Sequence, residues 1–132
     1  MFICGNGGSA GNAIHLANDF LYGIAKHTRG GMKIYALSTN QGMITCLANN
    51  VGYDHIYSEQ LAFLGQSSDL VVLSGSSNSP NILRALEQAK SMDARSCDIL
   101  GYMGGHCKSL ADSSIHCEVD GMQIAEGMQL MI

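Results

Sequence analysis

The feature that most constrains this fold is a unit that occurs twice: a short, mostly apolar run, a loop of small residues, then a helical pattern. Residues 1–4 lead into Gly-Asn-Gly-Gly-Ser at 5–9, and residues 69–73 lead into Ser-Gly-Ser-Ser-Asn-Ser at 74–79. Apolar runs of this length are typical of parallel strands that are covered on both faces. Because small residues follow each run immediately, each unit predicts a strand, a tight turn and a helix.

The remainder of the chain alternates in the same way. Ser9 and Ser79 are candidate helix N-caps, and a final helix would turn four apolar side chains inward. Strands that alternate with helices predict an α/β fold of three layers around a parallel sheet. Further strands are expected at 33–37, 97–102 and 114–119, helices at 10–24, 41–49, 52–64, 80–92 and 123–132, and inward-facing side chains at Ile124, Met128, Met131 and Ile132.

Composition limits the class of protein. The 132 residues, 46% hydrophobic and 14% charged, suit one globular domain over 1–132. With 7 basic and 11 acidic residues the formal charge is -4, which disfavours a nucleic-acid partner. No apolar run approaches the roughly 20 residues that span a bilayer, so we expect a cytoplasmic protein with no membrane partner. Because the chain opens in a strand and stops in a helix, we expect the domain to lack an N-terminal helix and the end of its C-terminal helix.

The two small-residue loops form the predicted ligand site. In an open α/β sheet, ligands bind at the carboxyl ends of strands, where free N–H groups at helix N-termini favour anions such as phosphate. The loop at 5–9 does not follow the Gly-x-Gly-x-x-Gly pattern, and no Gly-Lys-Ser/Thr occurs, so dinucleotides and ATP are disfavoured. The loops could also be no more than tight turns, but their repetition favours a phosphorylated ligand.

His15 and Asp19 form a second candidate feature. They are four residues apart in a predicted helix and therefore share one face. The spacing suits a metal pair or an acid/base pair, but on its own it favours a solvated or core-capping pair, because such pairs are common on helices.

Four motifs together resemble the sugar isomerase (SIS) domain, in its bacterial phosphoheptose isomerase branch. They are Gly5-Asn6-Gly7-Gly8-Ser9-Ala10, the segment from His15 to Asp19, the segment from Leu47 to Tyr57, and the serine-rich loop from Ser74 to Ser79. The resemblance implies a flavodoxin-like fold with a five-stranded parallel sheet. It also implies an aldose-ketose isomerase that acts on a phosphorylated sugar such as sedoheptulose 7-phosphate, and a homodimer or homotetramer whose neighbouring subunits complete each site.

The resemblance also assigns site residues. Gly75, Ser77 and Asn50 stand where the family has threonine, glycine and aspartate. The expected substrate-binding residues are Asn6, Gly7, Gly8, Ser9, Asn49, Asn50, Ser74, Ser76 and Ser79.

The implied catalytic group is Asp19 as base, Glu126 as second carboxylate, and His15 as ligand or acid. The family places zinc on the positions of His15 and Asp19, where Asp19 is a shorter acid than the family's glutamate. Ala125 replaces a glutamine ligand, and a further histidine is expected just after Ile132. These departures leave a second hypothesis: a non-catalytic SIS module that binds sugar phosphate as a sensor or serves as an assembly partner.

Overall fold

The computed structural model describes residues 1–27, 30–64 and 68–131. Within them, five parallel strands form one sheet in the order β2-β1-β3-β4-β5. The strands are β1 (Phe2–Gly5), β2 (Tyr35–Ala36), β3 (Leu70–Ser74), β4 (Ser96–Leu100) and β5 (Ser113–His116). The predicted α/β fold with a five-stranded parallel sheet is confirmed.

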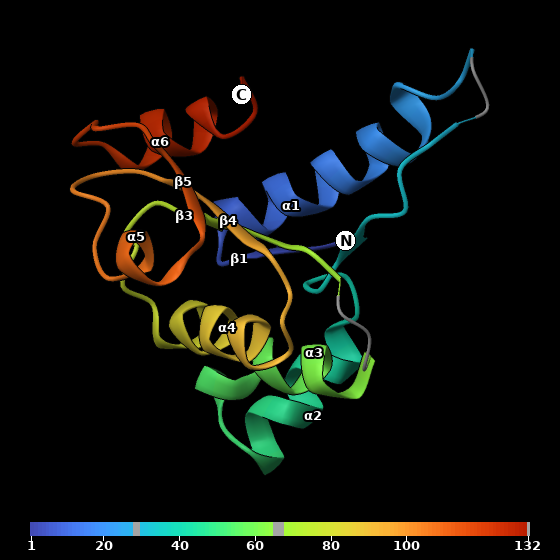
Figure 1. The fold of residues 1–132 in the computed structure, drawn as a ribbon, viewed down its shortest axis with the longest axis vertical. Helices are drawn as coiled ribbons and strands as arrows, with labels where there is room; N and C mark the ends of the chain where they lie inside the picture. The colour runs from blue at the N-terminus through green and yellow to red at the C-terminus, as the bar shows by residue number, and fades with distance from the viewer. Residues whose placement is uncertain (28–29, 65–67, 132) are drawn as a thin grey trace.

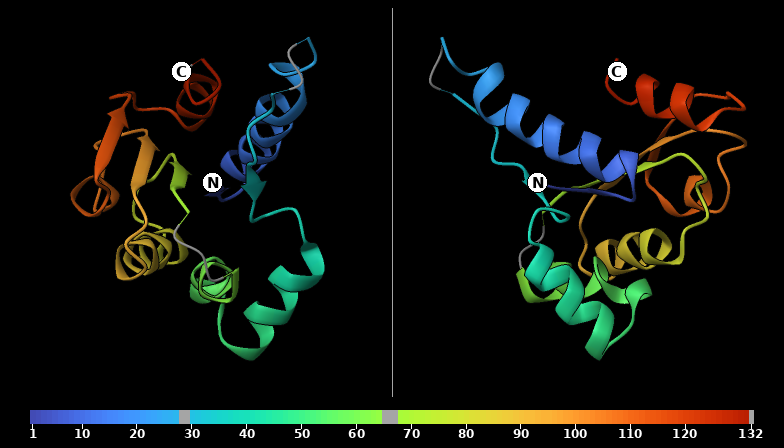
Figure 2. Two further views of the ribbon diagram at one scale, coloured as in Figure 1. Left: turned by 45° about the vertical axis from the view of Figure 1, so that its right-hand side comes forward. Right: turned by 180° about the vertical axis from the view of Figure 1, so that it is seen from behind.

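Helices cover both faces of the sheet (Figures 1 and 2). α1 and α6 lie on one side, and α2, α3 and α4 lie on the other. None of the described helices is long and apolar enough to cross a membrane. The helices are α1 (Gly8–Asn18), which continues as a π-helical turn at Asp19–Gly23, α2 (Gln41–Asn50), a 3-10 turn at Tyr53–His55, α3 (Ser58–Leu64), α4 (Pro80–Ser91), α5 (Cys107–Leu110) and α6 (Met122–Met128).

The core is divided by the sheet into two apolar clusters. Along β1, Ile3 packs in the cluster on the α1 side, whereas Phe2 and Cys4 pack on the other side with α3 and α4. Successive side chains of a strand point to opposite faces, so a strand that is buried on both sides must be apolar throughout. This explains why the strand signal in the sequence was a continuous run.

The helix predicted at 52–64 is a 3-10 turn at Tyr53–His55 followed by α3, which starts at Ser58, and the start of α1 also differs from expectation. α1 begins at Gly8, its N-cap is Gly7, and Ser9 lies inside the helix, where its hydroxyl accepts a hydrogen bond from Gln129 at 3.0 Å. The predicted N-cap at Ser9 is therefore wrong. Ser79 does occupy the N-cap position of α4, but its side chain makes no capping hydrogen bond.

The orientation expected for the last helix is also wrong. Ile124 and Met131 are 60% and 73% exposed, whereas Ala125 and Gln129 are each 2% exposed. A Cβ atom added to Gly101 would lie 2.6 Å from the Cβ of Ala125, so this side of α6 packs too closely for a large apolar side chain. The helix ends at Met128, Met128 is half-buried, and Ile132 lies outside the described residues.

Candidate functional site

The two small-residue loops lie on neighbouring strands. β1 and β3 pair with Gly5 opposite Leu73, so the loops at 5–9 and 74–79 leave the same edge of the sheet side by side. From β1 the chain continues to β2 at one edge of the sheet, and from β3 it continues to β4 on the other side. The strand order therefore reverses between the two loops, and such a reversal is where open α/β sheets bind ligands.

In the loop at 74–79, two of the four serines are available to a ligand, and the other two, Ser74 and Ser77, are buried. The hydroxyls of Ser76 and Ser79 lie 3.4 Å apart at the start of the 12-residue helix α4. Ser74 is 5% exposed, and its hydroxyl accepts the N–H of Ser77 at 2.9 Å. Ser76 and Ser79 can thus donate to a shared phosphate next to a helix N-terminus, whereas Ser74 shapes the loop.

Ser77 is the bend of that loop. It is fully buried and has a φ of 59°, in the left-handed region that favours glycine. Its carbonyl accepts the N–H of Cys107 at 3.1 Å, and the side chain of the neighbouring Asn78 accepts the N–H of His106 at 2.9 Å. The segment after β4 therefore holds the serine loop in place, and the left-handed backbone suits the glycine that the resemblance implies for this position.

The first loop is anchored from the opposite layer. The Tyr57 hydroxyl donates to the carbonyl of Gly5, and burial raises the pKa of Tyr57, which keeps the proton that makes this bond. Asn6 and Asn81 donate to each other at 2.8 Å in both directions. Beside these contacts opens a cavity of about 290 Å³ that Asn6 and Gly7 line together with Gln41 and Thr45 of α2.

Glu126 approaches the same loop from α6. It is half-buried, and its carboxylate occupies the space that a Cβ atom on Gly8 would need. Asn12 of α1 donates to the backbone carbonyl of Glu126 at 2.7 Å and to Gln129 at 2.9 Å. These bonds hold α6 against α1, and the carboxylate of Glu126 lies against a predicted substrate-binding glycine, Gly8.

His15 and Asp19 lie further along α1. His15 Nε2 is 3.2 Å from Asp19 Oδ2, and the two side chains are 60% and 47% exposed. At a rise of about 1.5 Å per residue, His15 is about 10 Å and Asp19 about 16 Å along the helix from Gly8. Within one subunit the pair stands apart from the two loops, as an exposed pair one helical turn apart.

The described residues do not by themselves make a zinc site. Catalytic zinc is held by three protein ligands, and among residues 1–27, 30–64 and 68–131 no group of three His, Cys, Asp or Glu side chains could hold a metal ion. His15 and Asp19 supply two ligands. The buried amide of Gln129 is already bonded to Ser9 and Asn12.

Asn49 and Asn50 are not brought to the loops. They lie at the C-terminal end of α2, where Asn49 donates to Asn50 at 3.1 Å and Asn50 donates to the thiol of Cys46 at 3.3 Å. Neither residue lines the cavity beside Asn6.

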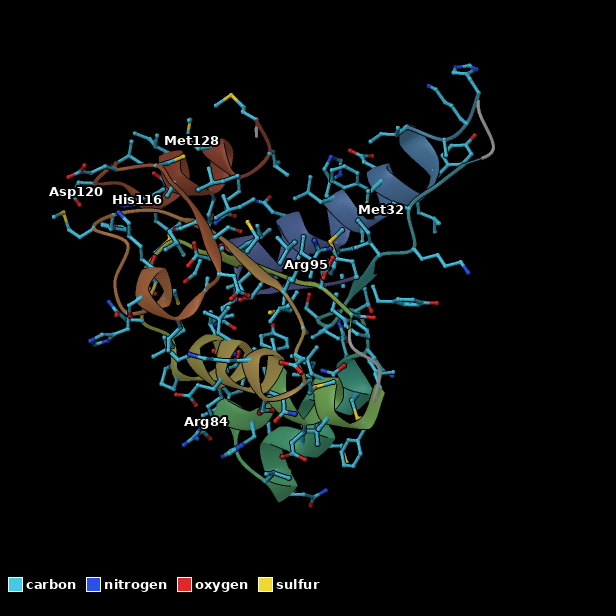
Figure 3. The ribbon with its side chains drawn as sticks, in the orientation of Figure 1. Met32, Arg84, Arg95, His116, Asp120 and Met128 are labelled. Atoms are coloured by element: carbon cyan, nitrogen blue, oxygen red, sulfur yellow. The ribbon has the colours of Figure 1, made fainter. Side chains whose placement is uncertain are left out.

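Arg84 of α4 and Arg95, directly before β4, form ion pairs outside the loops. Arg84 projects from α4 (Figure 3) and pairs with Asp54 at 2.9 Å, and this guanidinium holds the pKa of the Asp54 carboxyl below its usual range. Arg95 pairs with Asp69 at 2.7 Å, at the amino end of β3. Backbone N–H groups and hydroxyls are therefore the groups that the two loops themselves offer to an anion.

Sequence reasoning missed three residues that shape the site: Tyr57, Asn81 and Gln129. Tyr57 lay within a motif that carried the resemblance, but its role in holding Gly5 was not visible there. Asn81 follows Ser79-Pro80 directly, and its place as a polar residue in the first turn of a predicted helix is the one sequence signal that could have drawn attention to it. No local pattern marked Gln129.

Comparisons with known proteins identify the family. Residues 1–100 match the family described as "SIS domain". The chain is 35% identical over 133 residues to a phosphoheptose isomerase of Helicobacter pylori (strain Shi470), covering 100% of this chain and 69% of that protein. A phosphoheptose isomerase of Akkermansia muciniphila is 36% identical over 133 residues, covering 100% of this chain and 70% of that protein.

The solved structure of a phosphoheptose isomerase from Neisseria gonorrhoeae superposes with a TM-score of 0.88 at 27% identity, covering 98% of this chain and 69% of that one. Sequence and fold therefore lead to the same group, and the chain belongs to the SIS domain family, among the phosphoheptose isomerases.

Proposed function

We propose that this protein is an aldose-ketose isomerase that interconverts sedoheptulose 7-phosphate and a heptose 7-phosphate. The observation that carries the proposal is the pair of adjacent loops: Ser76 and Ser79 offer hydroxyls to a phosphate, and the neighbouring loop meets a carboxylate, that of Glu126. A sugar phosphate has both groups to match, an anion at one end and a carbonyl with an acidic C–H at the other. Membership of the phosphoheptose isomerases supports the substrate.

In the proposed reaction a carboxylate removes a proton from C1 of the ketose, and an enediolate forms across C1 and C2. The proton returns to C2 and the hydroxyl proton of O1 is transferred to O2, which leaves the carbonyl at C1. A positioned general base contributes about 100-fold or more to such a step. Glu126 is favoured as the proton-transfer group within one subunit because its carboxylate lies at the first loop, whereas Asp19 lies about 16 Å along α1. These steps use only side chains of this chain.

The test is to incubate the purified protein with sedoheptulose 7-phosphate and to follow aldose formation, with substrate binding measured in parallel. Ser76→Ala and Ser79→Ala should each weaken binding about tenfold, because each removes a charge-assisted hydrogen bond. Ser91→Ala, at the other end of α4, is the matched control. Glu126→Gln should lower turnover about 100-fold or more with binding retained, and Glu87→Gln on the exposed face of α4 is its control.

A second candidate function is the non-catalytic sensor or assembly module. The observation that favours it is the His15–Asp19 pair, which is exposed and distant from the loops within one subunit. Binding of sedoheptulose 7-phosphate without turnover would select this function. If Asp19→Asn rather than Glu126→Gln abolishes turnover, the site is shared between subunits and Asp19 is the base. The absence of both binding and turnover would reject the isomerase and the sensor and leave the assembly module.

We further propose that the protein works in the cytoplasm as a homodimer or homotetramer. Apolar side chains that would be costly to leave in water project from α1 and the π-helical turn that continues it, and from α6 and the residues that follow it, and a subunit contact would cover them. They include Ile14, Leu21, Ile124 and Met131, which are 42%, 54%, 60% and 73% exposed. Light scattering at micromolar concentration should give a mass of two or four subunits, and a monomer would contradict the proposal.

A further inference from the structure

Asn81 joins the two loops of the site through side chains alone. It is the second residue of α4, directly after Pro80, and it is 1% exposed. Its amide donates to Asn6 Oδ1 and accepts from Asn6 Nδ2, both at 2.8 Å. Such a reciprocal pair of amides fixes distance and rotation together, because both bonds must stay short and aligned at once.

The first loop needs an external anchor of this kind. It contains Gly5, Gly7 and Gly8, and Gly7 has a φ of 54°, so its backbone has access to many conformations. Asn81 stands two residues after Ser79, the N-cap of the same helix. The pair with Asn6 therefore ties the position of the first loop to the position of the hydroxyls that would bind phosphate.

We propose that Asn81 is a positioning residue that sets the separation between the phosphate-binding serines and the first loop, and thereby selects sugar phosphates by length. The inference rests on the proposed function, because it assigns one end of the substrate to each loop. An inorganic phosphate needs only the serine loop, whereas a sugar phosphate spans both. Loss of the Asn6–Asn81 pair should therefore weaken binding of the sugar phosphate and spare binding of inorganic phosphate.

The test compares the two ligands in Asn81→Leu, which keeps a side chain of similar volume and removes the amide. The dissociation constant for sedoheptulose 7-phosphate should rise about tenfold, and that for inorganic phosphate less than about twofold. Asp112→Ala is the matched control, because Asp112 accepts two hydrogen bonds from Ser96 at the opposite end of the sheet. It should lower thermal stability and leave the ratio of the two constants unchanged. A ratio that is also unchanged in Asn81→Leu would overturn the proposal.

A second measurement does not depend on the substrate. In ¹⁵N-¹H spectra, Asn81→Leu should shift the side-chain amide signal of Asn6 and the backbone amide signals of Gly7 and Gly8, and Asp112→Ala should leave them in place. If the unmodified protein failed to bind sedoheptulose 7-phosphate, the proposed function and the selection by length would fall together, and these spectra would still decide whether Asn81 positions the loop. Unshifted signals would show that it does not.

Discussion

The carboxylate of Glu126 stands over the α-carbon of Gly8, in the volume that any side chain at position 8 would require. The contact joins α6 to the first turn of α1, and residues 8 and 126 are 118 positions apart in the chain. The carboxylate of Glu126, the candidate proton-transfer group, can take this position only because residue 8 is a glycine.

Gly8→Ala should therefore lower the activity of the protein without lowering its stability. The added methyl group meets the flexible end of Glu126, which can move aside, and alanine is a better helix former than glycine by about 1 kcal/mol. We expect an unfolding temperature equal to or above that of the unmodified protein, together with a loss of turnover of about tenfold or more because the carboxylate is displaced. Gly11→Ala, where an added Cβ atom meets nothing within 4 Å, is the control. Full activity in Gly8→Ala would remove Glu126 from the proposed chemistry.

The left-handed backbone of Ser77 gives a prediction about stability alone. An alanine at a φ of 59° keeps the strain of a Cβ atom and loses the hydroxyl contact to the Ser74 carbonyl, whereas glycine loses the same contact and relieves the strain. In urea denaturation, Ser77→Gly should be more stable than Ser77→Ala by about 1 kcal/mol. The reverse order would mean that the loop abandons this conformation in the variants.

The hydroxyl of Tyr57 should be needed for the first loop. Tyr57→Phe leaves the carbonyl of Gly5 without its donor, and an unpaired buried carbonyl costs about 1–3 kcal/mol. Tyr35→Phe removes the same hydroxyl from a side chain that is 65% exposed and should change the free energy of unfolding by less than about 0.5 kcal/mol. Equal effects of the two substitutions would argue against an anchoring role for Tyr57.

Asp98 should make stability depend on pH. It is fully buried in β4, and neither carboxylate oxygen has a hydrogen-bond partner within the part of the chain that the structure describes. Burial raises the pKa of Asp98, although Ser114, His116 and Lys108 act in the opposite direction. A raised pKa in the folded state means that the protonated form is preferred there. The stability that this provides is complete below the unfolded-state pKa of about 3.9 and is lost as the pH rises through the folded-state pKa.

The corresponding variant is Asp98→Asn, which keeps the shape of the side chain and cannot ionise. At pH 7 it should be more stable than the unmodified protein by about 1 kcal/mol or more, and the difference should shrink toward pH 4. Thermal unfolding at several pH values between 4 and 7 measures this. A difference that is independent of pH would show that the carboxyl of Asp98 does not titrate in this range.

Local sequence patterns were sufficient to predict much of this fold. The Leu-Val-Val-Leu run predicted β3, the Ser79-Pro80 pair predicted the start of α4, and the small residues after β1 predicted the turn into α1. A strand can be predicted from the sequence because its consecutive side chains face opposite sides of the sheet, so the pattern is contained in neighbouring residues. β2, with two residues, and α5, with four, offer too little pattern to define their bounds.

The contacts that shape the site could not be predicted in this way. Tyr57, Asn81 and Gln129 bond to partners 52, 75 and 120 residues away, and nothing within a helical turn of each residue identifies the partner. The same limit explains the error in α6. Helical spacing located its apolar residues, but the close approach at Gly101 decided which face was turned inward.

The hydrogen bonds that attach α6 to α1 also determine the direction in which the Glu126 side chain points. Apolar packing alone would tolerate a helix that slides or rolls against its neighbour, but the bonds from Gln129 to Ser9 and from Asn12 to Gln129 admit a single rotational setting. A roll by one residue would carry Glu126 about 100° around the helix axis, away from the mouth of the first loop. The side-chain amide of Gln129, three positions after Glu126, thus fixes the rotation of α6 and with it the direction of this carboxylate. Substitutions at position 129 should therefore alter catalysis, although residue 129 does not itself contact a ligand.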